Sequence, residues 1–158
     1  MAVYFLDSSA LVKRYRTEQG TEVMKLLFPD SGSHEVLVVS SLVVVEMEST
    51  FARAVKAGTL SQLGRSRLLR QFQDDLKNRI GVNPLSGATM ALGAEMARKH
   101  ALRAGDALHL AVALQIRDAV GDAPVFVSSD KELVSAAQAE TLDVLNPQQP
   151  GAAQKLER

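Results

Sequence analysis

Four acidic residues lie at the ends of apolar segments of the chain or within them. They are Asp7 after AVYFL, Glu46 inside SSLVVVEMES, Asp106 inside RAGDALHLAVAL and Asp130 after VFVSS. A carboxylate just beyond the C-terminal end of a strand in an α/β protein points into the crevice where ligands bind. Carboxylate oxygens are also the hard ligands that Mg²⁺ and Mn²⁺ prefer. Together, the four residues predict a site for one or two divalent cations.

Such a site would favour the hydrolysis of a phosphodiester. A bound cation polarises a phosphoryl oxygen and lowers the pKa of bound water, and a second cation can stabilise the leaving oxygen. Water would then attack phosphorus in line, while an arginine or lysine assists the charged transition state. The chain has three histidines. Their spacing shows no histidine pair and no lysine–histidine set of the kind that a metal-independent ribonuclease would use.

Each acidic residue also has a purely structural interpretation. Asp7 could cap a helix, although Ser8 and Ser9 would serve equally well. Asp106 could cap the helix that it opens, and Asp130 lies in the first turn of a predicted helix, where an acid favours the dipole. Taken singly, none of these positions establishes a metal site.

Glu46 lies in the middle of a predicted helix rather than at its end. Ser49 and Thr50 follow Glu46 by three and four residues, and Arg53 lies on the same side of the helix. Glu46 therefore belongs to the more polar face. Glu48 shares a stripe with apolar residues instead and is the weaker candidate. A surface position would explain either glutamate without a function.

Apolar periodicity and turn residues predict strands that alternate with helices. Strands are expected at 2–6, 35–40, 80–85, 125–129 and 142–145. Helices are expected at 10–16, 21–28, 41–57, 61–79, 86–101, 106–119 and 130–139. Gly58 is expected to end the third helix and Gly105 to interrupt the chain before the sixth. Ser129 and Glu132 match a capping box for the seventh.

This alternation favours a parallel sheet with helices on both faces. Right-handed crossovers place the C-terminal ends of the strands at one edge. Asp7 and Asp130 would therefore lie close together if the first and fourth strands are neighbours. With 158 residues, the chain is expected to form one domain. We place this domain at 1–147 and expect a flexible polar tail, rich in proline and glutamine, at 148–158.

The composition sets further limits. The absence of cysteine excludes disulfides and thiolate metal sites and fits a reducing cytoplasm. We expect neither a secretion signal nor a membrane span, because no apolar run approaches the roughly 20 residues that a span needs. Eighteen basic residues balance eighteen acidic ones. The net charge therefore gives no overall indication of nucleic-acid binding.

Four segments together resemble the PIN domains of VapC toxins. They are DSSALVKRYRTEQG, SSLVVVEMES, RAGDALHLAVAL with its Asp-Ala-Leu-His helix, and VFVSSDKEL, and the resemblance runs from about residue 3 to Pro147. It implies a three-layer α/β/α fold whose five-stranded parallel sheet has the order 3-2-1-4-5. It also implies a Mg²⁺- or Mn²⁺-dependent endoribonuclease. Such toxins usually form homodimers and are neutralised by a small cognate antitoxin that inserts into the acidic groove.

Matched motif to motif, the resemblance implies that the acidic pocket consists of Asp7, Glu46, Asp106 and Asp130. Asp130 could act through a water molecule rather than bind metal directly. Ser9 and Ser128 could orient these carboxylates, although each could also cap a helix or form a turn.

Basic residues and one histidine could assist at this pocket. His109, one turn after Asp106, could contact substrate or be packed in the interior. Arg14, Arg16 and Arg53 could hold RNA phosphates.

Two other functions compete with a nuclease. A receiver-like phosphoacceptor module also has a five-stranded α/β fold, but it needs paired acids after the first strand, where this chain has only Asp7. A catalytically silent PIN scaffold would bind a partner without cleaving RNA. A haloacid-dehalogenase-like phosphatase would need an aspartate at position 9, which is Ser9. No glycine-rich loop follows the first strand, which disfavours a dinucleotide-binding protein.

Overall fold

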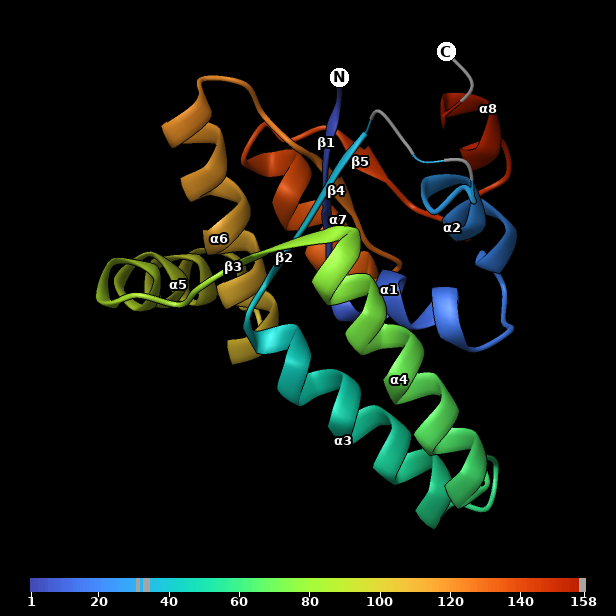
Figure 1. The fold of residues 1–158 in the computed structure, drawn as a ribbon. Coiled ribbons are helices and arrows are strands. Elements are labelled where there is room, and N and C mark those ends of the chain that lie inside the picture. The colour runs from blue at the N-terminus through green and yellow to red at the C-terminus, as the bar shows by residue number, and fades with distance from the viewer. Residues whose placement is uncertain (31, 33–34, 157–158) are drawn as a thin grey trace.

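Five parallel strands form the central sheet of the protein (Figure 1). The computed structural model describes residues 1–30, 32 and 35–156. The strands are β1 (Val3–Leu6), β2 (Val36–Ser40), β3 (Ile80–Asn83), β4 (Val125–Val127) and β5 (Val144–Leu145). Their order is β3-β2-β1-β4-β5, which confirms the predicted topology. β1 therefore lies between β2 and β4, and its residues pair with both.

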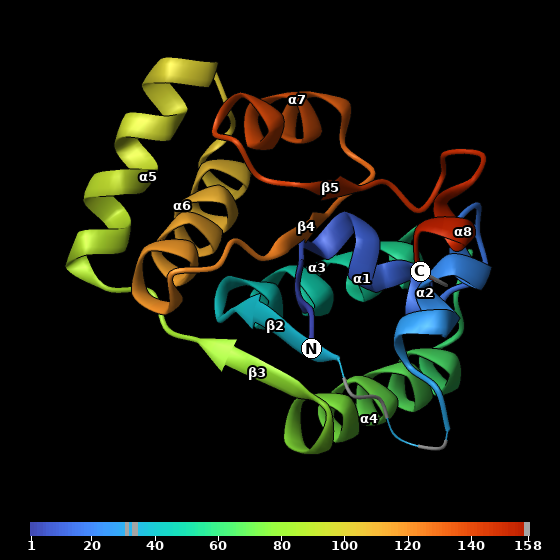
Figure 2. The ribbon, with the colours of Figure 1, turned by 90° about the horizontal axis from the view of Figure 1, so that it is seen from above.

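Helices cover both faces of this sheet, which makes the fold a three-layer α/β/α sandwich (Figure 2). Helices α5, α6 and α7 pack on one face, and α1, α2, α3, α4 and α8 on the other. Their bounds are α1 (Ser8–Tyr15), α2 (Thr21–Leu27), α3 (Leu42–Lys56), α4 (Gln62–Asn78), α5 (Gly87–His100), α6 (Ala104–Val120), α7 (Lys131–Ala139) and α8 (Ala152–Leu156). Within the described residues, none of the helices combines the length and apolar character that crossing a bilayer requires.

The alternation of side chains along β1 explains how one strand serves two cores. Leu6 packs with the helices of the first half of the chain, whereas Phe5 points to the opposite face. There the Phe5 ring stacks on Phe126 of β4, with the ring centroids 5.4 Å apart. A strand that is buried on both faces of a parallel sheet is expected to be apolar along its length, as β1 is. Burial of β1 on both sides fixes the position of Asp7, the residue that follows it.

Two details at helix N-termini differ from the sequence predictions. The N-cap of α7 is Asp130, whose Oδ1 accepts a hydrogen bond from the backbone N–H of Leu133 at 2.9 Å, so the capping box expected from Ser129 is wrong. Helix α6 begins at Ala104, so Gly105 lies inside its first turn and does not interrupt the chain. A Cβ at Gly105 would lie 3.4 Å from Oε2 of Glu46, so glycine allows close approach there.

The C-terminal segment also differs from the flexible tail expected at 148–158. Residues 152–156 form the short helix α8, and Ala152 is 3% exposed. α8 packs beside α2, and Leu156 contacts the core beneath the first four helices. Alanine and leucine side chains within this polar segment give it an apolar face that the overall composition conceals.

A buried carboxylate joins α1, α4 and the start of β3 on this side of the sheet. Asp75 of α4 accepts a hydrogen bond from the Tyr15 hydroxyl at 2.8 Å and contacts Arg14 at 3.3 Å and Arg79 at 3.7 Å. The Arg14 guanidinium also lies over the Phe28 ring, 4.7 Å from its centroid. Burial and the charge of Asp75 raise the pKa of Tyr15 far above its usual value, so its hydroxyl stays protonated and donates.

Replacing Tyr15 with phenylalanine should therefore destabilise the fold. The change keeps the ring, which packs against Phe51 and Phe72. It removes one donor from a buried carboxylate, and hydrogen bonds to charged groups contribute about 1.5–3 kcal/mol. Urea unfolding should show a loss in that range for Tyr15→Phe.

Tyr4→Phe is the matched control, because Tyr4 is equally buried and its hydroxyl has no hydrogen bond to any described residue. Equal unfolding free energies for the two variants would contradict a stabilising role for the Tyr15–Asp75 bond.

Candidate active site

Asp7 lies directly after β1 and is almost completely buried, with 2% of its surface exposed. Its carboxylate accepts hydrogen bonds from the Ser9 hydroxyl at 2.8 and 2.9 Å, from the Ala10 N–H at 2.9 Å and from the Ser128 hydroxyl at 2.8 Å. Asp7 is therefore the N-cap of α1 and also the centre of a hydroxyl network. Burial raises the pKa of Asp7, and the charge of His109 and these hydrogen bonds act in the opposite direction.

Ser128 connects Asp7 with Asp130 on the neighbouring strand. Its hydroxyl donates to Oδ2 of Asp7 and accepts a hydrogen bond from the backbone N–H of Asp130 at 3.1 Å. Ser9 accepts a further hydrogen bond from the backbone N–H of Ser129 at 3.1 Å. The pairing of Leu6 with Val127 brings these two strand ends together. The structure thus places Asp7 and Asp130 side by side, and Ser9 and Ser128 between them.

Glu46 reaches the same edge of the sheet from the second turn of α3. One of its carboxylate oxygens accepts a hydrogen bond from the Ser8 hydroxyl at 3.2 Å, and the other pairs closely with Nε2 of His109. Its side chain stays 28% exposed. Glu48 is exposed and forms no hydrogen bond or ion pair with any described residue, so the polar-face argument selected the glutamate that points toward the other acids.

His109 is completely buried beneath this group and links two elements. Its Nδ1 lies 3.1 Å from the Ser40 hydroxyl at the end of β2, and its Nε2 contacts Glu46. Burial alone would lower the pKa of His109, but the bond to Glu46 and the charges of Asp7 and Asp106 outweigh it, so the pKa is raised. The structure makes His109 an interior group that holds a carboxylate, which leaves it out of reach of a substrate.

Asp106 is the third residue of α6 and is only partly buried. Burial raises its pKa to about 6, and the charges of Asp130, Asp7 and Glu46 add to this effect while His109 opposes it. Asp106 therefore lies within electrostatic reach of the other three carboxylates. Asp106 accepts no hydrogen bond from any described residue. Its oxygens are therefore available to a ligand.

The chemistry of this group fits a divalent cation. Among the described residues, no lysine or arginine forms an ion pair with any of the four carboxylates, and their positive neighbour is His109. Hard carboxylate oxygens without a lysine or arginine partner suit Mg²⁺ or Mn²⁺. No three acidic or histidine side chains of the described part already converge in an arrangement that could hold an ion. Binding would therefore require the side chains to turn toward the ion.

The three predicted arginines occupy different environments. Arg14 is engaged by Asp75 and Phe28, so it does not lie among the carboxylates. Arg16 lies near the carbonyl oxygen and hydroxyl of Thr59, at 3.4 and 3.5 Å. Arg53 is exposed on α3 and has no ion pair among the described residues.

Sequence reasoning missed three residues that shape the site. Ser8 and Ser40 hold Glu46 and His109, and Gly105 lets the Glu46 carboxylate approach α6. A sequence signal existed for Ser40, because it ends β2 at the same edge where Asp7 follows β1. Ser8 and Gly105 follow from contacts across tens of residues, and no local pattern indicates them.

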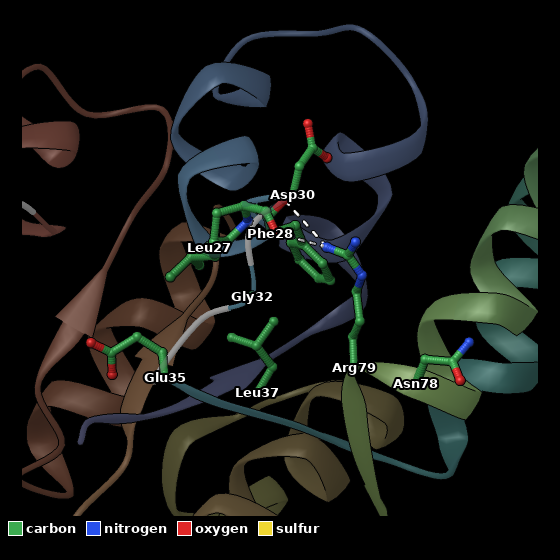
Figure 3. Close-up of a pocket in the computed structure, with 9 residues that line it drawn as sticks. Leu27, Phe28, Asp30, Gly32, Glu35, Leu37, Asn78 and Arg79 are labelled. Atoms are coloured by element: carbon green, nitrogen blue, oxygen red, sulfur yellow. Dashed lines mark hydrogen bonds between the residues drawn. The ribbon is translucent and has the colours of Figure 1, made fainter.

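A surface pocket of about 330 Å³ lies elsewhere (Figure 3). Its lining includes Leu37 at the beginning of β2 and Arg79 immediately before β3, so it is at the N-terminal ends of the strands. Figure 3 shows the Arg79 guanidinium directed toward the backbone carbonyls of Phe28 and Pro29, with which it forms hydrogen bonds. The pocket is therefore at the opposite edge of the sheet from the carboxylates. We identify the candidate active site by its chemistry, because none of its four carboxylates lines this pocket.

Comparisons with known proteins agree with the fold. The family model of the PIN domain matches residues 4–139. Ribonuclease VapC45 and Ribonuclease VapC49, from two strains of Mycobacterium tuberculosis, are each 30% identical over 140 residues, which cover 88% of this chain and 92% of each relative.

Solved structures share the fold at much lower identity. A crystal structure from Pyrobaculum aerophilum superposes with a TM-score of 0.66 at 16% identity, over 99% of this chain and 90% of the other. VapBC2 from Rickettsia felis, bound to a DNA fragment from its promoter, gives a TM-score of 0.60 at 13% identity, over 91% of this chain and 98% of the other. A toxin–antitoxin complex from Klebsiella pneumoniae gives a TM-score of 0.59 at 12% identity, over 91% of this chain and 97% of the other. The chain belongs to the PIN domain family, and its curated relatives within that family are VapC proteins.

Proposed function

We propose that this protein is a divalent-metal-dependent endoribonuclease that acts as the toxin of a toxin–antitoxin pair. The observation that carries this proposal is the meeting of four carboxylates, from the end of β1 and from α3, α6 and α7, without a lysine or arginine paired to them in the described structure. The curated relatives are named as ribonucleases, which supports RNA as the substrate.

The four acids would contribute differently to the binding of one or two ions. Asp106 has free oxygens, and Asp130 uses only Oδ1 for its helix cap, so these two offer the most accessible ligands. Asp7 and Glu46 complete the set, and the surrounding hydroxyls and His109 keep them oriented. Bound Mg²⁺ or Mn²⁺ would polarise the phosphoryl group and activate water for hydrolysis.

Partners and location follow from the same family likeness. The structures from Klebsiella pneumoniae and Rickettsia felis contain a toxin–antitoxin complex and VapBC2, which supports a small cognate antitoxin for this chain. We further propose that the protein forms a homodimer and acts in the cytoplasm, where its RNA substrates would be.

The strand order argues against the receiver-like alternative. Receiver domains have the order 2-1-3-4-5, whereas here β1 lies between β2 and β4. A catalytically silent PIN scaffold has the same fold as a nuclease, so only the chemistry separates them.

Asp106→Asn tests the nuclease directly. The change keeps the size of the side chain and removes a negative charge that the proposed ions need, so RNA cleavage with Mg²⁺ or Mn²⁺ should fall by about 100-fold or more, equivalent to roughly 3 kcal/mol of activation free energy. The measurement is cleavage of total RNA by wild type and variant, each with either metal.

Glu48→Gln is the matched control, because it removes an exposed acid from the same helix as Glu46. The control should cleave like the wild type, and chelator should abolish cleavage by both. Cleavage that persists in chelator, or that is unchanged in Asp106→Asn, would sink the metal-nuclease proposal and favour a silent scaffold or a contaminating enzyme.

Metal binding should also be visible as thermal stabilisation. A ligand at 100 times its Kd stabilises a protein by about 2.7 kcal/mol, which for a chain of this length raises Tm by roughly 5–10 °C. Wild type should show this shift with Mg²⁺ or Mn²⁺. Asp106→Asn should melt at or above the wild type without metal, because like charges are removed, and should respond little to metal. An identical metal response in both proteins would place the ion elsewhere.

His109 should affect metal affinity and activity by positioning Glu46 rather than by contacting the substrate. His109→Leu fills the buried space but removes the partner of Glu46 Oε1, so that only Ser8 still donates to Glu46. Loss of a group that orients a ligand typically costs 10–100-fold in metal affinity or activity. His109→Gln should recover most of the loss, because its amide can still donate. Calorimetric Mn²⁺ titration together with kcat would measure both effects.

His100→Leu is the control, because His100 also pairs with a glutamate, Glu140, at 2.6 Å, but away from the site. Equal Mn²⁺ affinities for His109→Leu and His100→Leu, both folded, would show that His109 has no positioning role.

A further inference from the structure

The zero net charge of the chain conceals a strongly positive segment. Residues 49–73 contain five of the eighteen basic residues and none of the eighteen acidic residues. The remainder of the chain therefore has thirteen basic and eighteen acidic residues, a formal charge of minus five. We call residues 49–73 the basic arm; they span the C-terminal half of α3, the following turn and most of α4. Its basic residues are Arg53, Lys56, Arg65, Arg67 and Arg70.

The positive charges of the basic arm are not neutralised by any residue that the structure describes. Four of its five basic side chains are exposed, and Arg65 is half-buried. None of the five side chains forms a hydrogen bond or ion pair with any described residue. Some basic residues elsewhere are paired: Lys13 pairs with Glu18 at 2.7 Å and Lys99 with Glu140 at 2.5 Å. The basic arm therefore keeps its charge available to a partner.

The basic arm projects from the body of the protein as a helical hairpin. Figure 1 shows α3 and α4 running together away from the sheet, with the turn between them at the far end. Phe51 of α3 and Phe72 of α4 are buried and both pack against Tyr15 of α1. Because the apolar side chains face inward, the hairpin is anchored at its base and turns its basic residues outward.

The positive surface begins close to the carboxylates. Thr50 and Arg53 follow Glu46 by four and seven residues, so they lie on the same face of α3 as the glutamate. At 1.5 Å per residue, Arg53 is about 10 Å and Lys56 about 15 Å along the helix axis from Glu46. One helix thus carries a candidate metal ligand at one end and unpaired cations toward the other.

We propose that the basic arm binds the sugar–phosphate backbone of the RNA strand that is cut at the carboxylates. This inference rests on the proposed ribonuclease function. A site of four carboxylates repels a polyanion, so positive charge nearby must attract the strand. Four of the five basic residues are arginines, whose planar guanidinium groups match phosphate geometry. Backbone binding of this kind does not depend on base sequence.

An acidic protein segment could be attracted by the same charge. RNA is the better match, because the basic face continues from Glu46, where the phosphate to be cut must lie. Arg16, the residue that follows α1, adds a further cation beside the arm, since it shares a groove with Arg67, Thr59 and Leu60. The positive surface therefore extends from the basic arm to the C-terminal end of α1.

The test compares two double variants of the whole protein. Arg53→Gln with Lys56→Gln removes two charges from the basic arm, and Lys77→Gln with Arg98→Gln removes two exposed charges that also lack ion pairs but lie outside it. Binding of a labelled single-stranded RNA of mixed sequence is followed by fluorescence anisotropy in chelator, over a series of salt concentrations. Each phosphate contact contributes about 0.7 to the slope of log affinity against log salt.

For the arm variant we expect weaker binding at low salt and a salt slope smaller by about 1.4, because two phosphate contacts are lost. With metal, KM for RNA should rise several-fold while kcat changes little. The double variant Lys77→Gln, Arg98→Gln should match the wild type in RNA affinity, salt slope, KM and kcat. Equal affinity and slope for the two double variants would overturn the inference, as would an arm variant that loses binding to a protein partner while keeping RNA binding.

Failure of the proposed function would look different. If wild type never cleaves RNA with either metal but binds it through the basic arm, the nuclease proposal fails and RNA binding by the arm stands. If wild type cleaves and the arm variant binds and cleaves equally well, only the arm inference fails.

Discussion

Four carboxylates held together, with no described lysine or arginine paired to them, are the constraint on which this structure depends. Asp7, Glu46, Asp106 and Asp130 meet at one edge of the sheet, and burial and mutual repulsion raise the pKa of Asp106 to about 6. Repulsion of this kind must be offset by the rest of the fold. β1 is buried on both faces, and its pairing with β4 fixes two strand ends beside each other. The rigid sheet therefore keeps carboxylates close that would separate in a looser scaffold.

The fold also separates its charges. A polyanionic substrate must approach a negative site, and the attraction has to come from positive charge placed to one side. Helix α3 supplies both: Glu46 near its N-terminal end and unpaired Arg53 and Lys56 toward its C-terminal end. The hairpin that α3 forms with α4 is anchored by Asp75 and Tyr15, so the charged surface is held in a fixed relation to the carboxylates. A zero net charge is consistent with this arrangement.

The resemblance to PIN domains predicted the sheet order, and local patterns predicted that Asp7 and Asp130 stand at strand ends. Asp7 and Asp130 follow apolar strands, and the end of a parallel strand is a position that local patterns reveal. The Glu46–His109 pair is different, because the two residues are separated by 63 positions and their contact depends on how α3 and α6 pack. The helix N-termini at 104 and 130 also differed from expectation, since several polar residues compete for each cap. Helix α8 was missed because its few apolar side chains lie in a polar segment.

Capping and metal binding are compatible roles for the same aspartate. Asp130 uses one carboxylate oxygen to cap α7, which fixes the side chain and leaves the other oxygen free. Asp7 caps α1 through Oδ1, while the Ser9 and Ser128 hydroxyls can turn toward other acceptors if an ion takes their place. A cap therefore acts as a positioning device, because the backbone N–H groups of a helix hold the carboxylate at a defined point. The helices that follow the strands thus contribute to the site through their first turns, and a residue that looks structural in the sequence can also be a ligand.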